Sequence, residues 1–265
     1  MKRILDVFRA RPRVAVIRLQ GVISAGARGG LSDHALAPTI ERAFRRGKPK
    51  AVALVINSPG GSPVQSALIA ARIRRLAEER KMPVHAFVED VAASGGYWLA
   101  TAADDIWLDA NSVAGSIGVI SAGFGFADLM ARHGIERRVH TAGASKSFLD
   151  PFRPEKAEDV ERLRAILEPI HAAFKAQVTA RRGDRLPQGR DLFTGDVWVG
   201  QGAVDVGLAD GIAHVVPKLK SLYGDKVRLI PYGVKRSIFQ RFTGRLLGAA
   251  LDEIDERALW ARYGM

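Results

Sequence analysis

Short apolar runs alternate with longer amphipathic segments along the first half of the chain. The apolar runs predict strands, at residues 14–19, 51–56, 84–88 and 105–108. Between them, apolar residues spaced three and four apart predict helices, at residues 35–46, 64–81 and 95–103. The run 51–56 is apolar throughout, as in strands buried on both faces of a parallel sheet. This alternation predicts an α/β fold in which helices flank a parallel sheet.

The second half of the chain has longer helical segments. Strands are expected at residues 113–120 and 137–141, and helices at residues 126–133, 155–182 and 213–223. A further helix is expected within residues 197–206, ended by Gly207. Pro169 should kink the long helix, because proline cannot donate the backbone hydrogen bond of a helix interior.

We expect one large domain, residues 13–233, between two basic ends. Residues 1–12 form a short basic segment, and residues 234–265 are predicted to form a basic amphipathic helical tail. Such a helix suits an anionic membrane surface. Its apolar face could equally pack on the protein itself or on a neighbouring subunit, and acidic residues in its second half weaken the membrane interpretation.

Ser94 is the best candidate for a nucleophile. It stands in Ala92-Ala93-Ser94-Gly95-Gly96-Tyr97, between an apolar run and an Ala-rich helix. Small neighbours can leave a hydroxyl exposed at a tight strand-to-helix turn, and the glycines let backbone amides approach whatever the oxygen attacks. The simpler interpretation is a small residue required for tight helix packing.

A second Gly-Gly turn, Asn57-Ser58-Pro59-Gly60-Gly61-Ser62, directly follows a predicted buried strand. Backbone amides aimed at a developing oxyanion are what acyl transfer requires. Taken alone, the segment fits an ordinary strand-to-helix turn. Paired with the turn at Ser94, it makes the amides of Gly61 and Gly95 candidate oxyanion donors.

A serine nucleophile needs a base to accept its proton. None of the six histidines lies in a Gly-rich turn, although a Ser-His-Asp arrangement is defined by geometry and stays open. Lys146 lies in a small-residue segment, Gly143-Ala144-Ser145-Lys146-Ser147, where docking could desolvate it and favour a neutral amine. Most lysines in such a basic chain are solvated surface residues.

These segments together resemble the S49 serine peptidases, the signal peptide peptidase A group. The resemblance covers residues 13–216 and rests on the motifs at Ser94 and Lys146, with further matches in residues 55–61 and 115–119 and at Pro151-Phe152. It implies a ClpP/crotonase fold of repeated ββα units and a catalytic dyad of Ser94 and Lys146. It further implies cleavage of peptide bonds, with no cofactor or metal, and a homo-oligomeric ring.

Candidate substrate-binding residues surround the nucleophile. They are Gly60, Gly115, Ser116, Ile117 and Gly118. An apolar strand over residues 115–119 could pair with an extended peptide, as in other strand-addition sites. The alternative is a core strand interrupted by bulges.

Composition narrows the remaining possibilities. The chain has 265 residues, no cysteine and a net charge of +12. The absence of cysteine excludes disulfides, a thiol nucleophile and cysteine-ligated zinc. The basic excess favours an anionic partner such as a membrane surface, whereas no nucleic-acid-binding motif is present. No apolar run reaches the ~20 residues of a membrane span, and the N-terminus is a poor signal peptide. We therefore expect a cytoplasmic protein, with peripheral contact at the inner membrane as a further possibility.

Two other functional classes remain open. A crotonase-like acyl-CoA enzyme would use the same oxyanion amides, with Glu89 as the nearest acid–base group. A non-enzymatic basic scaffold would bind a membrane surface through its ends. Neither gives Ser94 and Lys146 a role, so cleavage of extended apolar peptides, such as remnant signal peptides, is the leading hypothesis.

Overall fold

A computed structural model describes residues 11–25, 30–143, 145–233, 257 and 259–264. These residues form two compact units, which we describe separately. The first comprises the described parts of residues 1–117 and 176–265, and the second comprises residues 118–175. Among the described residues, no helix is long and apolar enough to cross a membrane.

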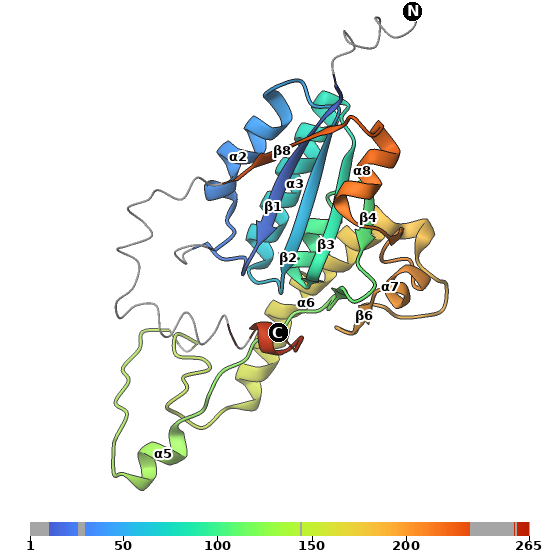
Figure 1. The fold of residues 1–265 in the computed structure, drawn as a ribbon. Helices are drawn as coiled ribbons and strands as arrows, with labels where there is room; N and C mark the ends of the chain where they lie inside the picture. Colours follow the sequence, from blue (N-terminus) through green and yellow to red (C-terminus); the bar gives the residue numbers. More distant parts are fainter. Residues whose placement is uncertain (1–10, 26–29, 144, 234–256, 258, 265) are drawn as a thin grey trace, which may run out of the picture. The chain divides into compact units, whose positions relative to one another are not determined.

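The first unit is built around a mostly parallel sheet (Figure 1). In chain order its strands are β1 (Arg13–Gln20), β2 (Ala51–Ser58), β3 (Val84–Ala93), β4 (Asp105–Leu108), β5 (Val113–Gly115), β6 (Val197–Val199), β7 (Gly211–Ile212) and β8 (Arg228–Tyr232). Their order across the sheet is β6-β5-β3-β2-β1-β8, with β4 pairing with both β3 and β7. The pair β5–β6 is antiparallel and the other pairs are parallel.

Helices cover both faces of this sheet. The helices of the first unit are α2 (Asp33–Arg45), α3 (Pro63–Arg80), α4 (Gly95–Ala100), the end of α6 (Ala157–Arg182), α7 (Gln201–Asp205) and α8 (Val215–Tyr223), with a short 3-10 turn at Gly183–Arg185. Leu219 of α8 packs on Val14, Ala53 and Phe87 on one face, and Figure 1 shows α3 on the other. Every residue of β2 is buried, as its uninterrupted apolar run predicts. The predicted α/β class, a parallel sheet flanked by helices, is confirmed.

Several predicted elements differ from the observed ones. Residues 197–199 form strand β6 rather than the start of a helix, because they pair with β5, and helix α7 begins only after Gly200. The predicted strand at 137–141 is absent from the described structure. The strand expected over 113–120 ends at Gly115 and has β3 on one side and β6 on the other, so the prediction that an apolar strand over 115–119 could pair with a peptide is wrong. Strands β7 and β8 were not predicted.

The second unit contains α5 (Ala127–Arg132) and the first part of α6. Among its described residues, Phe174 is the one apolar side chain that is buried. Large apolar side chains are instead exposed, with Phe124 at 82%. The ring of Phe126 stacks on that of Phe152, 5.6 Å between centroids, and the Arg137 guanidinium lies over the Phe152 ring.

Candidate active site

Three of the predicted site segments begin where neighbouring parallel strands end. Gly60 and Gly61 follow β2, Ser94 follows β3, and Ser116 follows β5. Because β5, β3 and β2 are adjacent and parallel, their carboxyl ends meet at one edge of the sheet. Ligand sites in open parallel sheets form at this edge.

A bulge in β3 allows the strand to extend to Ala93, the residue before Ser94. Ile56 pairs with Val88, but Ser58 pairs with Ala92, so β3 has extra residues between these pairs. The Asn57 side chain binds this bulge: its amide group donates to the Asp90 carboxylate, and its oxygen accepts from the Val91 amide at 3.3 Å. The sequence places Asn57 in a turn motif but gave no sign of this role. As a result β3 extends to Ala93 rather than ending at Val88.

The backbone of Ser94 adopts a conformation that is rare for a residue with a side chain. Its φ is 52° and its ψ is −122°. Such a conformation costs about 1–3 kcal/mol and is found where surrounding structure enforces it, often at functional sites. Although Ser94 is the N-cap of α4, its hydroxyl makes no capping hydrogen bond, so the oxygen is not occupied by the helix that follows.

The two Gly-Gly turns pack closely against each other. A Cβ atom on Gly60, whose φ is +105°, would lie 2.8 Å from both the Ala93 carbonyl oxygen and the Ser94 Cβ. A Cβ atom on Gly61, whose φ is +137°, would lie 2.1 Å from the Ile23 carbonyl oxygen. Only glycine fits at either position, since the backbones themselves are in contact. This packing explains why the turn after β2 carries both glycines.

The amides of Gly61 and Gly95 lie beside one another next to Ser94. Ile23 donates to the Gly60 carbonyl and accepts from the Ser62 amide, both at 2.8 Å, which leaves the Gly61 amide outside this pairing. Within the described part of the chain, neither the Gly61 amide nor the Gly95 amide donates to a backbone carbonyl. A Cβ atom on Gly95 would lie 3.4 Å from the Gly61 nitrogen. The structure therefore brings both predicted donors to one place.

The predicted substrate-binding residues of segment 115–118 begin beside Ser94. The Ser94 amide donates to the Gly115 carbonyl, and the next residue, Ser116, also has a positive φ of 53°. Ser116 donates its amide to the Asp196 carbonyl at 2.6 Å and accepts a hydrogen bond from the Tyr263 hydroxyl at 3.2 Å. Ile117 is fully buried. Gly118 belongs to the second unit.

Lys146 also belongs to the second unit, where its side chain is exposed. The turn that carries it is fixed by Asp150. This carboxylate accepts from the Phe152 amide at 3.1 Å and from Arg137 and Ser147, each at 3.4 Å. The backbone hydrogen bond from Phe152 is the main reason why the pKa of Asp150 is lowered.

Two other titratable side chains, those of His85 and Glu89, form hydrogen bonds of their own away from Ser94. His85, at the opposite end of β3 from Ser94, binds the Asp105 carboxylate at 2.9 Å and the Tyr223 hydroxyl at 2.7 Å. Glu89, the acid–base candidate of the crotonase hypothesis, accepts two hydrogen bonds from Arg18 at 2.8 and 2.6 Å. This ion pair occupies the carboxylate that the hypothesis requires.

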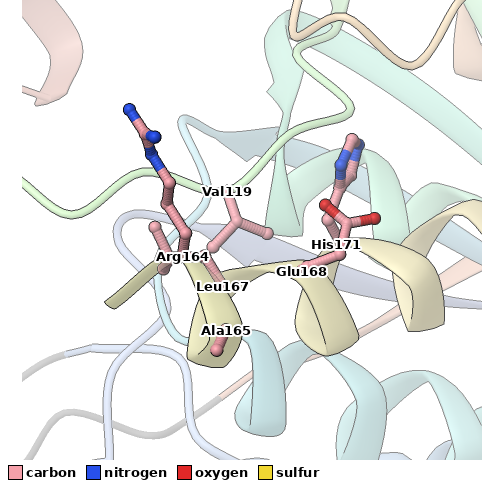
Figure 2. A pocket seen from close by; sticks show the side chains of 6 residues that line it. All are labelled: Val119, Arg164, Ala165, Leu167, Glu168 and His171. Atoms are coloured by element: carbon pink, nitrogen blue, oxygen red, sulfur yellow. The ribbon is translucent and has the colours of Figure 1, made fainter. Parts of the chain in front are cut away.

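The second unit contains a groove of about 450 Å³ between Val119 and α6 (Figure 2). Val119, Ala165 and Leu167 give it an apolar lining, and Arg164, Glu168 and His171 supply its polar side chains. Val119 directly follows Gly118 in the sequence. One lining residue of the groove is therefore the next residue after the predicted substrate-binding segment 115–118. None of the predicted catalytic or oxyanion residues lines it.

Comparison with known proteins identifies the family. The model of peptidase family S49 matches residues 77–223, more than half of the chain. A protein of Brucella melitensis named Na(+)/H(+) antiporter NhaA is 45% identical over 97% of this chain, which spans 38% of that longer protein. The chloroplastic serine protease SPPA of Arabidopsis thaliana is 33% identical over 78% of this chain and 32% of its own length.

Protease 4 of Haemophilus influenzae is 31% identical over 78% of this chain and 34% of its own length. The chain thus spans about a third of the length of these relatives. The matched region includes the Ser94 turn, the segment 115–119 and the Lys146 turn. On this match, the chain belongs to peptidase family S49.

Proposed function

We propose that the chain is a serine peptidase in which Ser94 is the nucleophile and Lys146 the general base. One observation carries the proposal: a serine in a strained backbone conformation lies beside two neighbouring amides, those of Gly61 and Gly95. Family membership supports the reaction class, and the names of the relatives include a serine protease and a protease 4.

The proposed reaction is acyl transfer in two steps. The neutral Lys146 amine accepts the Ser94 proton while Oγ attacks the peptide carbonyl, and the amides of Gly61 and Gly95 stabilise the oxyanion. Lys146 then protonates the leaving amine, which gives an acyl-enzyme. In the second step Lys146 deprotonates a water molecule that attacks the ester, and the proton returns to Ser94 as the carboxylic acid leaves. Each oxyanion donor would contribute about 3 kcal/mol to transition-state stabilisation.

The substrate class that fits best is an extended, apolar peptide, such as a remnant signal peptide. The segment from Gly115 to Gly118 would lie alongside the substrate, with Gly60 close to the scissile bond. The groove at Val119 supports the preference, because Val119, Ala165 and Leu167 form an apolar part of its lining and Val119 directly follows this segment in the sequence.

We also propose that the chain acts as a homo-oligomeric ring. The second unit supports this, since a segment of its size with one buried apolar side chain among its described residues leaves its other apolar groups exposed. Exposed apolar surface of this kind marks interaction sites, and a second copy of the chain would cover it. Desolvation of Lys146 would then accompany assembly.

The basic tail is proposed to touch anionic membrane surfaces. Most of residues 234–265 lie outside the described structure, so this proposal rests on sequence pattern and charge. Co-sedimentation with phosphatidylglycerol vesicles tests it. We expect the full chain to bind more strongly than a variant that ends at Gly233, and equal binding would refute a role for the tail.

Hydrolysis of an apolar reporter peptide tests the proposed catalytic residues. Ser94→Ala and Lys146→Ala should each reduce the rate at least ~1000-fold, since the nucleophile and its base act as a unit. Ser221→Ala, on the surface of α8, and Lys156→Ala, at an exposed lysine of the second unit, are matched controls and should retain wild-type rates. A folded Ser94→Ala or Lys146→Ala variant with substantial activity would refute the assignment.

A further inference from the structure

The far end of the helix that follows Ser94 is held by α6. Helix α4 is six residues long, fully buried, and followed by carbonyl groups without partners inside the helix. Arg181 supplies two of the missing donors: Nε donates to the Thr101 carbonyl at 2.9 Å and Nη2 to the Ala103 carbonyl at 2.8 Å. Gln177, one turn earlier on α6, donates to the Thr101 hydroxyl at 3.0 Å.

These contacts continue through α4 to Ser94. The Thr101 hydroxyl, which accepts from Gln177, donates to the Trp98 carbonyl at 2.6 Å. The Trp98 amide in turn donates to the Ser94 carbonyl at 3.0 Å. A chain of hydrogen bonds therefore runs from α6 to the peptide group whose orientation sets the ψ angle of Ser94.

A second set of contacts fixes α4 against residues 207–210. The Tyr97 hydroxyl donates to the Leu208 carbonyl at 2.8 Å, and burial raises the pKa of this phenol, which keeps it a donor. Arg182 binds the neighbouring Gly207 carbonyl and the Asp210 carboxylate at 2.8 and 2.7 Å. Arg182 is almost completely buried, so its removal would unfold the protein rather than report on Ser94. Arg181 is partly exposed and can be replaced more safely.

We propose that Arg181 and Gln177 are positioning residues for the nucleophile, holding α4 so that Ser94 keeps its strained backbone and its alignment with the oxyanion donors. The inference rests on the proposed function of Ser94. The last two turns of α6 would then affect the reaction rate separately from stability. The reason is that α4, with six residues, needs contacts from outside the helix to fix its position.

The rate of phosphonylation of Ser94 by a fluorophosphonate probe measures nucleophile alignment without a peptide substrate. We expect Arg181→Leu to reduce this rate and kcat by roughly 10- to 100-fold with little change in KM, as misplacement of a reacting group does. Arg181→Lys, which can still donate to a carbonyl, should recover part of the loss. Gln177→Leu is a milder second variant, for use if Arg181→Leu does not fold, and should also slow phosphonylation.

Arg72→Leu is the matched control. Arg72 forms a bidentate ion pair with Asp33 between α3 and α2, with both atom pairs at 2.7 Å, and its other side-chain hydrogen bond among the described residues goes to Glu41, also on α2. It should lower the melting temperature but leave the phosphonylation rate of the folded protein unchanged. Wild-type phosphonylation rates in folded Arg181→Leu and Gln177→Leu would overturn the inference. An unreactive wild type would instead refute the proposed function, so the two failures are distinguishable.

Discussion

The backbone amide of Ser94 donates a hydrogen bond to the Gly115 carbonyl oxygen, 2.8 Å away. This bond joins the ends of β3 and β5. Each strand is followed by a serine with a positive φ, Ser94 after β3 and Ser116 after β5. The candidate nucleophile and the first residues of the predicted substrate segment are thus parts of one backbone arrangement. A change that moves either strand end should affect both.

Gly60→Ala should damage the site through the backbone. The new Cβ atom would contact Ala93 and Ser94, and the residue would have to adopt a φ of +105°. We expect a loss of about 2–4 kcal/mol in the free energy of unfolding, with activity reduced further in the protein that remains folded. Gly202→Ala, in α7, is the control: its Cβ atom would meet open space, and the change should be neutral or stabilise by up to about 1 kcal/mol. Urea unfolding and a peptide assay on both variants check this, and a Gly60→Ala protein as stable and active as the wild type would contradict the described packing.

The ion pair between Arg72 and Asp33 should make part of the stability depend on pH. The hydrogen bond from Arg72 lowers the pKa of Asp33 below its ordinary value of 3.8. Since the pKa is lower in the folded state, the pair stabilises the protein above about pH 4, and this contribution disappears as the pH falls through the folded-state pKa. Asp33→Asn should therefore lower the melting temperature at pH 7, and the difference from the wild type should shrink towards pH 2. Asp184→Asn, at an exposed carboxylate, serves for comparison. A difference that is constant with pH would rule out this role for the Asp33 charge.

Light scattering at micromolar concentration should give a mass several times the 28.7 kDa of one chain. Phe124→Asp places a charge at the most exposed aromatic side chain of the second unit and should shift the mass towards that of a single chain. Leu222→Asp, on an apolar side chain of α8 that is 45% exposed, should leave the mass unchanged. A fully active protein with the mass of one chain would refute both the ring and any site shared between subunits.

The dependence of the hydrolysis rate on pH distinguishes a lysine base from a histidine base. A lysine accepts a proton only in its neutral form, so the rate should continue to rise on the alkaline side. A histidine base would instead give a single limb near pH 6.5 followed by a plateau. Measurement of kcat/KM from pH 5 to 10 tests this, with Lys146→Arg as a variant that should lose activity throughout. A plateau from pH 7 upward would contradict the assignment.

The sequence predicts the parallel sheet well because its central strands are unbroken apolar runs. Strand β8 is the clearest omission: Pro231 argues against a strand, yet β8 lies at the edge of the sheet, where proline is tolerated. Strand β6 was predicted as the start of a helix, because three residues before Gly200 carry little periodicity of their own. Its pairing with β5, distant in sequence, decides its conformation.

The candidate site was predictable only where its residues form local sequence motifs. Ser94, Gly61 and Gly95 stand out as local motifs, and the structure brings them together. The bulge held by Asn57, the positive φ of Ser94 and the contacts of Arg181 with the end of α4 depend on residues distant in the chain. Such contacts leave no local pattern, so they could be found only in the folded chain.

The central claim, that Ser94 is the nucleophile, is tested most directly by finding the residue that a fluorophosphonate probe modifies. The folded wild-type protein should be labelled once per chain, with the phosphonyl group located on Ser94 by peptide mass spectrometry. Ser94→Ala should abolish labelling, whereas Ser221→Ala should be labelled like the wild type. Labelling at another residue, or undiminished labelling of Ser94→Ala, would contradict the assignment.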